Sequence, residues 1–285
     1  MEATETKSSA VDKLKSALPL ALLVGVGAYL LVSAIITAGY LLGIGGLRHR
    51  VIDNRSAVEI RRYRGTERDV IIPSHLEDLP VTRIRADAFY RDGIHLLRRM
   101  RGIIDSVTIP DTVTYIGSRA FMNNRLAYVT IPDSVTYIGR DAFSRNRLTS
   151  ITIPDSVTHL SGFSGNQITY VTIPNNVTHI GQWAFSSNQI AYVTIPNSVT
   201  HIGQWAFRNN ELTAVTIPDA VTYIGEMAFR ANQLAHVTIP DSVTYIGSNA
   251  FRNNRLNYVS VPSHATVAEN AFDRDVTVTR RERRN

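Results

Sequence analysis

From Val107 to Phe272 the chain repeats one pattern of apolar and polar positions. A typical copy reads V-T-I-P-D-S-V-T-Y-I-G-x-x-A-F-x-x-N-x-L-x-x, and one proline marks each copy. The spacings between these prolines are 22, 22, 20, 22, 22, 22 and 22 residues: Pro110, Pro132, Pro154, Pro174, Pro196, Pro218, Pro240 and Pro262. A fixed period of this length is typical of a solenoid, whose units bury their apolar sides against their neighbours. We therefore predict a repeat solenoid over residues 69–275, with about nine coils about 4.8 Å apart.

The first half of a copy has the alternation of a half-buried strand. In Leu126–Ile131 the residues Leu126, Val129 and Ile131 recur as apolar, and Thr130 between them faces outward with a period of two. Pro132 ends the strand because it has no N–H for ladder pairing. Strands of successive copies are expected to pair in parallel, which makes the solenoid β-rich.

The second half of a copy supplies two further interior columns. An Ala-Phe step is expected in a short helical or 3₁₀ turn, and its ring is expected to be buried once per coil: Phe143, Phe185, Phe207, Phe229 and Phe251. Another column is asparagine in every full copy: Asn124, Asn146, Asn166, Asn188, Asn210, Asn232 and Asn254. A buried amide is costly unless it is hydrogen-bonded. We interpret the asparagines as a structural ladder.

The outward positions also form columns, and these hold the candidate binding residues. One column is threonine: Thr108, Thr130, Thr152, Thr172, Thr194, Thr216 and Thr238. The neighbouring strand column and a pair of equivalent tryptophans give the candidate partner-binding residues, which are Tyr128, Tyr170, Tyr192, Tyr258, Trp183 and Trp205. Tyrosine and tryptophan are typical anchors at protein interfaces. The alternative is that these rings only pack on their neighbours in the ladder, and the two groups are expected on different faces.

Neither catalysis nor metal binding is predicted. The chain has no cysteine, no Gly-x-Ser-x-Gly, no His-Glu-x-x-His and no phosphate-binding glycine loop. His159, His179 and His201 share a column with tyrosines, but parallel side chains do not converge on an ion as zinc requires. We interpret these histidines as ladder residues and predict no catalytic residue, no metal ligand and no cofactor.

An uncharged run precedes the repeats. Ser16 to Leu47 contains 32 residues without a charge, whereas about 20 apolar residues span a bilayer and a signal-peptide core has about 7–15. We predict a tail over residues 1–17 and one transmembrane helix over Leu18–Leu47, which would hold the chain in a membrane. A long signal sequence is the alternative.

Basic residues flank both the run and the repeats, within a net charge of +6. Residues 48–68 are predicted to be a basic juxtamembrane linker and the start of a cap, and residues 276–285 a basic tail. Because lysines or arginines lie on both sides of the run, its orientation stays open. The tail has no stacking aromatic residues beside it, so no nucleic-acid partner is expected.

The repeated phrase closely resembles the BspA-like leucine-rich repeats, especially those of the treponemal type. The resemblance covers roughly Ser56 to Asp275, with asparagine where that family often has cysteine. It implies surface adhesion and protein binding, a periplasmic or surface-exposed repeat domain, and a ligand on the concave strand face. The membrane run departs from the family and leaves the side of the membrane open.

The function predicted from these observations is that of a membrane-anchored protein that mediates protein–protein interaction or adhesion through its repeat surface. The alternative is a scaffold tethered by the same helix and facing the cytoplasm.

Overall fold

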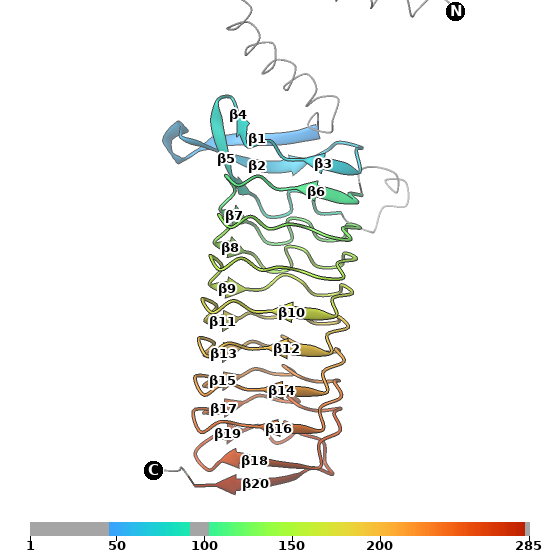
Figure 1. The fold of residues 1–285 in the computed structure, drawn as a ribbon, viewed down its shortest axis with the longest axis vertical. Coiled ribbons are helices and arrows are strands. Elements are labelled where there is room, and N and C mark those ends of the chain that lie inside the picture. Colours follow the sequence, from blue (N-terminus) through green and yellow to red (C-terminus); the bar gives the residue numbers. More distant parts are fainter. Residues whose placement is uncertain (1–45, 92–102, 283–285) are drawn as a thin grey trace, which may run out of the picture.

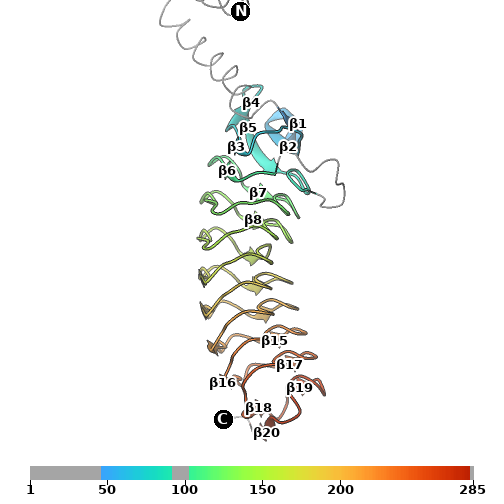
Figure 2. The same ribbon diagram turned by 90° about the vertical axis from the view of Figure 1, so that its right-hand side faces the viewer.

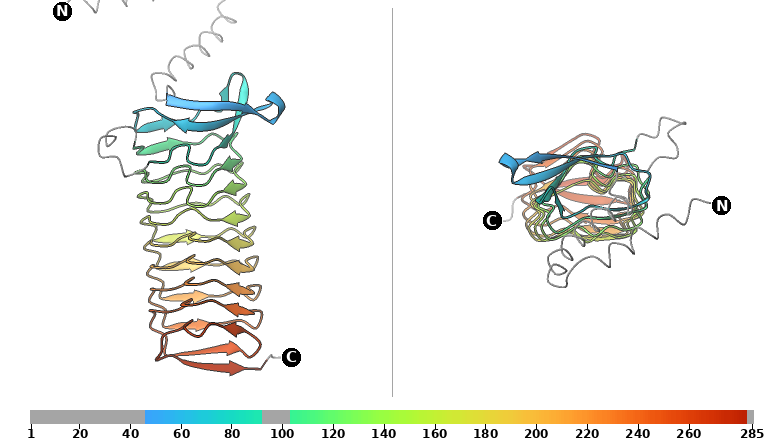
Figure 3. Two further views of the ribbon diagram at one scale, coloured as in Figure 1. Left: turned by 180° about the vertical axis from the view of Figure 1, so that it is seen from behind. Right: turned by 90° about the horizontal axis from the view of Figure 1, so that it is seen from above.

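Each copy of the repeat makes one turn of a stack of coils (Figure 1). The computed structural model describes residues 46–91 and 103–282. Viewed along the stack, successive coils superimpose on nearly one outline (Figure 3). The parallel strand-paired solenoid predicted from the sequence is confirmed, and all pairs between successive repeats in the described residues are parallel.

One face of the stack is built from the first apolar segment of each copy. Its strands are β3 (Asp69–Ile71), β6 (Ser106–Thr108), β10 (Tyr170–Thr172), β12 (Tyr192–Thr194), β14 (Ala214–Thr216), β16 (His236–Thr238), β18 (Tyr258–Pro262) and β20 (Thr277–Arg281). They pair two by two, as in β10 with β12 and β14 with β16. Their central residue faces inward and the flanking residues face outward, as the alternation predicts.

The longest sheet is built from the second apolar segment, which the sequence had not assigned to a strand. Its strands in the repeats are β7 (Tyr115–Ile116), β8 (Tyr137–Ile138), β9 (His159–Leu160), β11 (His179–Ile180), β13 (His201–Ile202), β15 (Tyr223–Ile224), β17 (Tyr245–Ile246) and β19 (Thr266–Val267). Within the repeats these strands pair in the order β7-β8-β9-β11-β13-β15-β17-β19. Figure 2 shows the two rows of strands on different sides of the stack.

A β-hairpin covers the N-terminal end of the stack. It consists of β1 (Leu47–Ile52), the 3₁₀ turn η2 (Asp53–Arg55) and β2 (Ala57–Tyr63), with β1 and β2 antiparallel. The hairpin joins the long sheet through β5 (Leu79–Ile84), and β4 (His75–Leu76) lies beside β5. Most of the stretch expected as a linker at 48–68 is therefore paired strand.

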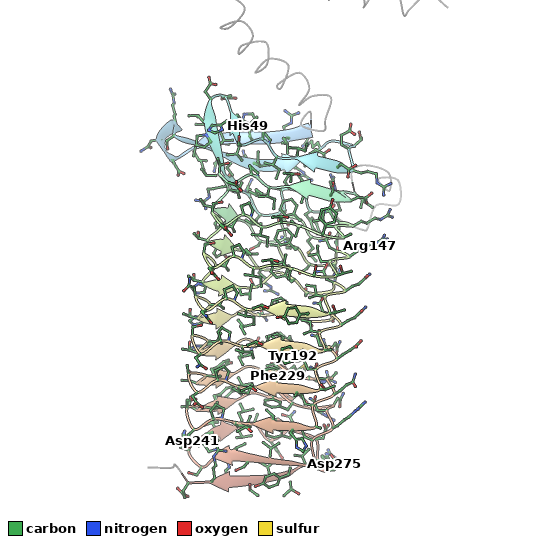
Figure 4. The ribbon with its side chains drawn as sticks, viewed as in Figure 1. His49, Arg147, Tyr192, Phe229, Asp241 and Asp275 are labelled. Atoms are coloured by element: carbon green, nitrogen blue, oxygen red, sulfur yellow. The ribbon has the colours of Figure 1, made fainter. Side chains whose placement is uncertain are left out.

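The interior is a continuous ladder of stacked rings. From Phe89 to Phe272 each coil contributes one phenylalanine, and neighbouring ring centroids lie 4.8–5.8 Å apart. Tyr63 of the cap continues the ladder at 5.5 Å from Phe89. The five phenylalanines predicted to be buried are fully buried, as Phe229 illustrates in Figure 4.

The asparagine column binds the backbone of adjacent coils. Asn188 Nδ2 donates to the carbonyls of Phe163 and Phe185 at 2.9 and 3.0 Å, and Asn188 Oδ1 accepts from the Ile168 N–H at 3.1 Å. The same three contacts recur at Asn166 in the preceding coil and at Asn210 in the following coil. The predicted structural ladder is confirmed.

The Ala-Phe step lies in tight turns, so the prediction of a helical or 3₁₀ turn is wrong. Ala184 N–H donates to the carbonyl of Gly181, and Trp183 between them has φ 61°. A residue with positive φ interrupts a right-handed helix. In the described part of the chain the only helical segment is η2, in the cap.

The glycine that precedes this turn permits close stacking of the coils. A Cβ added to Gly203 would lie 2.8 Å from a backbone carbon of Gly181, and one on Gly225 would lie 2.6 Å from the backbone nitrogen of Gln204. A typical copy of the repeat thus has glycine after the isoleucine because the backbone of the adjacent coil leaves no room for a Cβ there. In the 20-residue copy Gly162 takes the alanine position, and its carbonyl accepts from the Phe143 N–H at 2.8 Å.

Several sequence predictions fall at or beyond the limits of the described residues. No helix within residues 46–91 and 103–282 is long and apolar enough to cross a membrane, and Leu18–Leu47 lies outside that range except for its end at 46–47. Residues 277–281 of the predicted basic tail form β20, which pairs with β18. The division of the chain into segments stays a prediction.

Candidate functional site

Tyr170 and Tyr192 form an exposed pair on the first strand face. They are paired residues of β10 and β12, their ring centroids lie 6.4 Å apart, and the rings are parallel to within 1°. Their exposed fractions are 53% and 58%, and Figure 4 shows Tyr192 over β12. Hydrogen bonds to threonine hydroxyls hold both phenols: Tyr170 to Thr172 at 2.6 Å, and Thr194 to Tyr192 at 3.4 Å.

The two other candidate tyrosines lie in the same column but apart from this pair. Ser150 separates Tyr128 from Tyr170, and two coils with Ala214 and His236 separate Tyr192 from Tyr258. Both outlying tyrosines are exposed. The threonine column alongside is exposed from Thr108 to Thr238, as predicted.

The long sheet carries a second outward column, which is a stack of flat rings. Tyr115 and Tyr137 stack at 4.7 Å, and a run of five rings follows from His159 to Tyr245 with centroids 4.7–5.8 Å apart. Because each ring covers the face of the next, mainly ring edges remain for a ligand. This column fits the interpretation of histidine as a substitute for tyrosine in a ladder.

His179 lies between the two other histidines of this column. Burial, and then the neighbouring His201 and His159, lower the pKa of His179. Nδ1 of each ring lies within hydrogen-bond distance of the preceding threonine hydroxyl, at 3.2, 2.9 and 2.8 Å along the column. No group of three or more His, Cys, Asp or Glu within the described residues is arranged to hold a metal ion.

Trp183 and Trp205 lie at a third position, in the turns that follow β11 and β13. Their ring centroids are 4.7 Å apart, and both side chains are half-buried. Their φ angles of 61° and 56° belong to the left-handed region, which favours glycine or asparagine and costs other residues about 1–2 kcal/mol. The structure thus separates the tryptophans from the tyrosine pair, as expected from the sequence spacing.

Sequence reasoning missed a column of arginines next to the tryptophans. Arg208, Arg230 and Arg252 each follow a ladder phenylalanine, so they occupy equivalent positions in three successive coils. The signal was present in the repeat alignment, where this position is serine in the three preceding coils and then arginine in three. Reading charge down each column would have found it.

The fold and these outward columns define a leucine-rich-repeat solenoid with exposed columns of rings and no enzyme-specific feature in the described residues. The chain belongs to the family described as BspA type leucine rich repeat region, which matches residues 100–162 and 160–279 and contains six copies. The resemblance seen in the repeated phrase is therefore confirmed.

Crystal structures of other proteins are similar to this chain, among them the two that follow. A leucine-rich repeat protein from Bacteroides ovatus has a TM-score of 0.63 and 24% identity over 82% of this chain and 66% of its own. A leucine rich cell surface protein from Faecalibacterium prausnitzii has a TM-score of 0.56 and 25% identity over 84% of this chain and 75% of its own. The match thus spans just under two thirds of the Bacteroides chain. No curated protein matches this chain.

Proposed function

We propose that this chain is a membrane-anchored, surface-exposed protein that binds another protein through the outward face of its first strand row. The observation that carries the proposal is the exposed pair Tyr170 and Tyr192 on two paired strands. The family and the similarity to a leucine rich cell surface protein support a binding role at a surface. Leu18–Leu47 is the proposed anchor.

The geometry of the tyrosine pair suits a protein interface. Tyrosine combines a large apolar ring with a polar hydroxyl, and it is enriched among the residues that dominate binding energy. Here the rings are held parallel by strand pairing and by the bonds to Thr172 and Thr194. Little rotational freedom remains to be lost on binding, which favours affinity. Tyr128 and Tyr258 extend the proposed face in both directions.

Paired alanine substitutions test this face. The double variant Y170A/Y192A is expected to stay folded, because the column already accepts alanine at Ala214. It is expected to lose capture of a partner from a surface extract, because the proposed binding rings are removed. The control variant W183A/W205A, on a different face, is expected to keep capture. Loss of capture by the tryptophan variant alone would assign the binding site to the face that carries the tryptophans. Retention by both folded variants would contradict an aromatic protein-binding site.

A cytoplasm-facing scaffold is the second candidate function. It is favoured by the arginines that follow the predicted anchor, Arg48, Arg50 and Arg55, because basic residues tend to remain on the cytoplasmic side. Protease treatment of intact cells separates the two. A surface domain is degraded without lysis, whereas a cytoplasmic domain is degraded only after lysis.

A further inference from the structure

Met227 continues the outward column of the tryptophan pair. It occupies the turn position that Trp183 and Trp205 hold in the two preceding coils, and all three residues have positive φ, between 53° and 61°. Trp183 stacks on Trp205, and the thioether of Met227 follows in the next coil. Met227 is only partly buried, so its side chain remains in contact with solvent. The two indoles are therefore followed by a thioether side chain that small solutes can reach.

Two side-chain donors converge on this sulfur. Trp205 Nε1 donates to Met227 Sδ at 3.0 Å, and Arg230 Nη1 lies 3.7 Å from the same atom. The turn brings Arg230 there, because its N–H donates to the Met227 carbonyl at 3.2 Å. A thioether is a weak acceptor, whereas a guanidinium makes its strong hydrogen bonds to oxygen. Both donors therefore meet an atom that satisfies them poorly.

The equivalent turns of two other coils place an oxygen at this point. In the following coil Asn249 Oδ1 accepts from Arg252 Nη1 at 3.2 Å. In an earlier coil Asp141 Oδ1 accepts from Ser144 Oγ at 2.9 Å. In both cases the acceptor lies three residues before the donor, which is also the spacing from Met227 to its arginine. The turn thus positions a side-chain oxygen for the donor that follows it, and Met227 has sulfur in that place.

The surroundings of Met227 hold more donors than acceptors. Nε of Arg230 is buried and has no hydrogen-bond partner among the described residues. The same is true of Nε1 of Trp183, the indole that stacks on Trp205. A buried donor without an acceptor is costly. An oxygen atom added to Met227 would give the donors at its turn a strong acceptor.

We propose that Met227 is a site of reversible oxidation, whose sulfoxide is held by Trp205 and Arg230. With hydrogen peroxide as the oxidant, a lone pair of Sδ attacks one peroxide oxygen: the S–O bond forms, the O–O bond breaks and water leaves. The sulfur loses two electrons and the peroxide gains them. The new oxygen takes the acceptor position that Asn249 Oδ1 has in the next coil. Methionine sulfoxide reductases reverse the change.

The two donors distinguish Met227 from a methionine that is merely accessible. Oxidation commonly disrupts packed structure, because an apolar side chain becomes polar. At Met227 the polar oxygen gains hydrogen bonds, so the folded state is expected to become more stable. Met122 is the comparison within the chain, because it is also partly buried but its sulfur receives no hydrogen bond from residues 46–91 and 103–282. The site lies apart from the tyrosine face, so this inference does not depend on the proposed protein partner.

Thermal unfolding before and after treatment with hydrogen peroxide tests the proposal on the full chain in detergent micelles. The variant M100L/M122L keeps Met227, and M100L/M227L keeps Met122. Mass spectrometry after proteolysis confirms the sulfoxide at the retained residue. Oxidation of the first variant is expected to raise the thermal midpoint by about 2–4 °C, and the reductases are expected to restore it. The second variant is expected to melt at the same or a lower temperature after oxidation. An unchanged or lower midpoint in the first variant, or an equal rise in both, would overturn the proposal.

Removal of the donors separates their effect from that of polarity alone. W205F/R230S, made in M100L/M122L, keeps a ring beside Trp183 and introduces the residue that the arginine column carries at Ser186. Oxidation of Met227 in this variant is expected not to raise the midpoint. A rise as large as that of the chain with both donors would mean that they do not hold the sulfoxide, which contradicts the proposal.

A permanent acceptor gives a second test, which needs no oxidant. M227N introduces the residue of the equivalent position at Asn249. Because asparagine also favours the left-handed conformation, the substitution is compared in two chains, one with Arg230 and one with R230S. We expect M227N to raise the midpoint by about 2–4 °C more in the chain with Arg230, since only there does the arginine donate to the new oxygen. An equal rise in both chains would show that no such hydrogen bond forms and would overturn the inference.

Discussion

At the scale of single residues, one buried asparagine per coil links the side-chain core to the backbone of its neighbours. Asn188 accepts from the Ile168 N–H and donates to the carbonyls of Phe163 and Phe185. Those carbonyls also accept from other asparagines of the column, so they keep a partner when Asn188 is removed. The Ile168 N–H has no such replacement. The ladder therefore stabilises the fold chiefly by satisfying an interior donor in each coil.

Substitution of Asn188 by alanine is expected to destabilise the protein by about 1–3 kcal/mol, because it leaves a buried N–H without an acceptor. Urea unfolding of the full chain, followed by circular dichroism, measures the change in midpoint. Gln189→Ala removes an exposed amide in the adjacent position and is the matched control, with little expected effect. Equal stability of the two variants would contradict the structural role of the ladder.

The phenylalanine column makes a larger contribution. Phe207 is fully buried and stacks at 5.7 and 5.5 Å on Phe185 and Phe229. Phe207→Ala is expected to cost about 3–5 kcal/mol, because it leaves a cavity between two rigid rings. Tyr192→Ala, on the first strand of the same coil, removes a mostly exposed ring and serves as the comparison. A loss below about 1 kcal/mol for Phe207→Ala would contradict burial of this column.

At the scale of elements, the sequence predicted what depends on residue type and missed what depends on backbone shape. The alternation around Thr130 and the recurring Phe207 position predicted inward and outward columns correctly. The long sheet was not expected, because each of its strands in the repeats is only two residues long, as in His201–Ile202. The turn was predicted wrongly because Trp183 and Met227 stand at positive φ, where the usual signal is glycine or asparagine.

The candidate site was likewise predicted only in part. Spacing placed Tyr170 beside Tyr192 and Trp183 beside Trp205, and both pairs stack. The contact that joins Trp205 to Arg230 through Met227 depends on how the side chains fold back over the turn. Residue types alone do not specify that contact, whereas the arginine column itself could have been read from the aligned repeats.

Because of the histidine stack, we expect the stability of the protein to depend on pH. Burial, His201 and His159 lower the pKa of His179, so the folded state binds its proton less readily than the unfolded state. Neutral His179 contributes fully to the free energy of unfolding above the unfolded-state pKa of about 6.5. This contribution is lost as the pH falls from there toward the lower pKa of the folded state. Thermal unfolding between pH 7.5 and pH 5 is expected to show a falling midpoint.

Tyrosine occupies the same column in other coils, so the variant H159Y/H179Y/H201Y is the matched test of this effect. In this variant the thermal midpoint is expected to depend less on pH between pH 7.5 and pH 5. His264→Gln changes a histidine outside the stack and should leave the slope unchanged. A slope in the tyrosine variant equal to that of the parent would contradict a contribution from the stack.

At the scale of the whole molecule, stability is distributed along one axis, and the two ends differ. The hairpin of β1 and β2 covers the N-terminal end and continues the ring ladder through Tyr63. At the other end β20 pairs with β18, and Arg281 is held by Asp241 and by the carbonyls of Ser260 and Ile239. Between these ends each coil contacts mainly its neighbours, so interior coils are interchangeable units.

Removal of one interior coil tests this organisation. Gln182 and Gln204 are equivalent residues 22 positions apart, joined by a hydrogen bond of 3.2 Å. Deletion of residues 183–204 therefore connects Gln182 to Trp205 and keeps every column in register. We expect this variant to remain folded, with an unchanged circular dichroism signal per residue and a modest fall in thermal midpoint, because one coil and one interface are lost. Deletion of residues 183–193 removes only half a period, so inward columns of the following coils would be turned toward solvent. This variant is expected to disrupt the stack. If both deletions unfold the chain equally, the coils do not act as repeating units and the fold depends on this particular pair of copies.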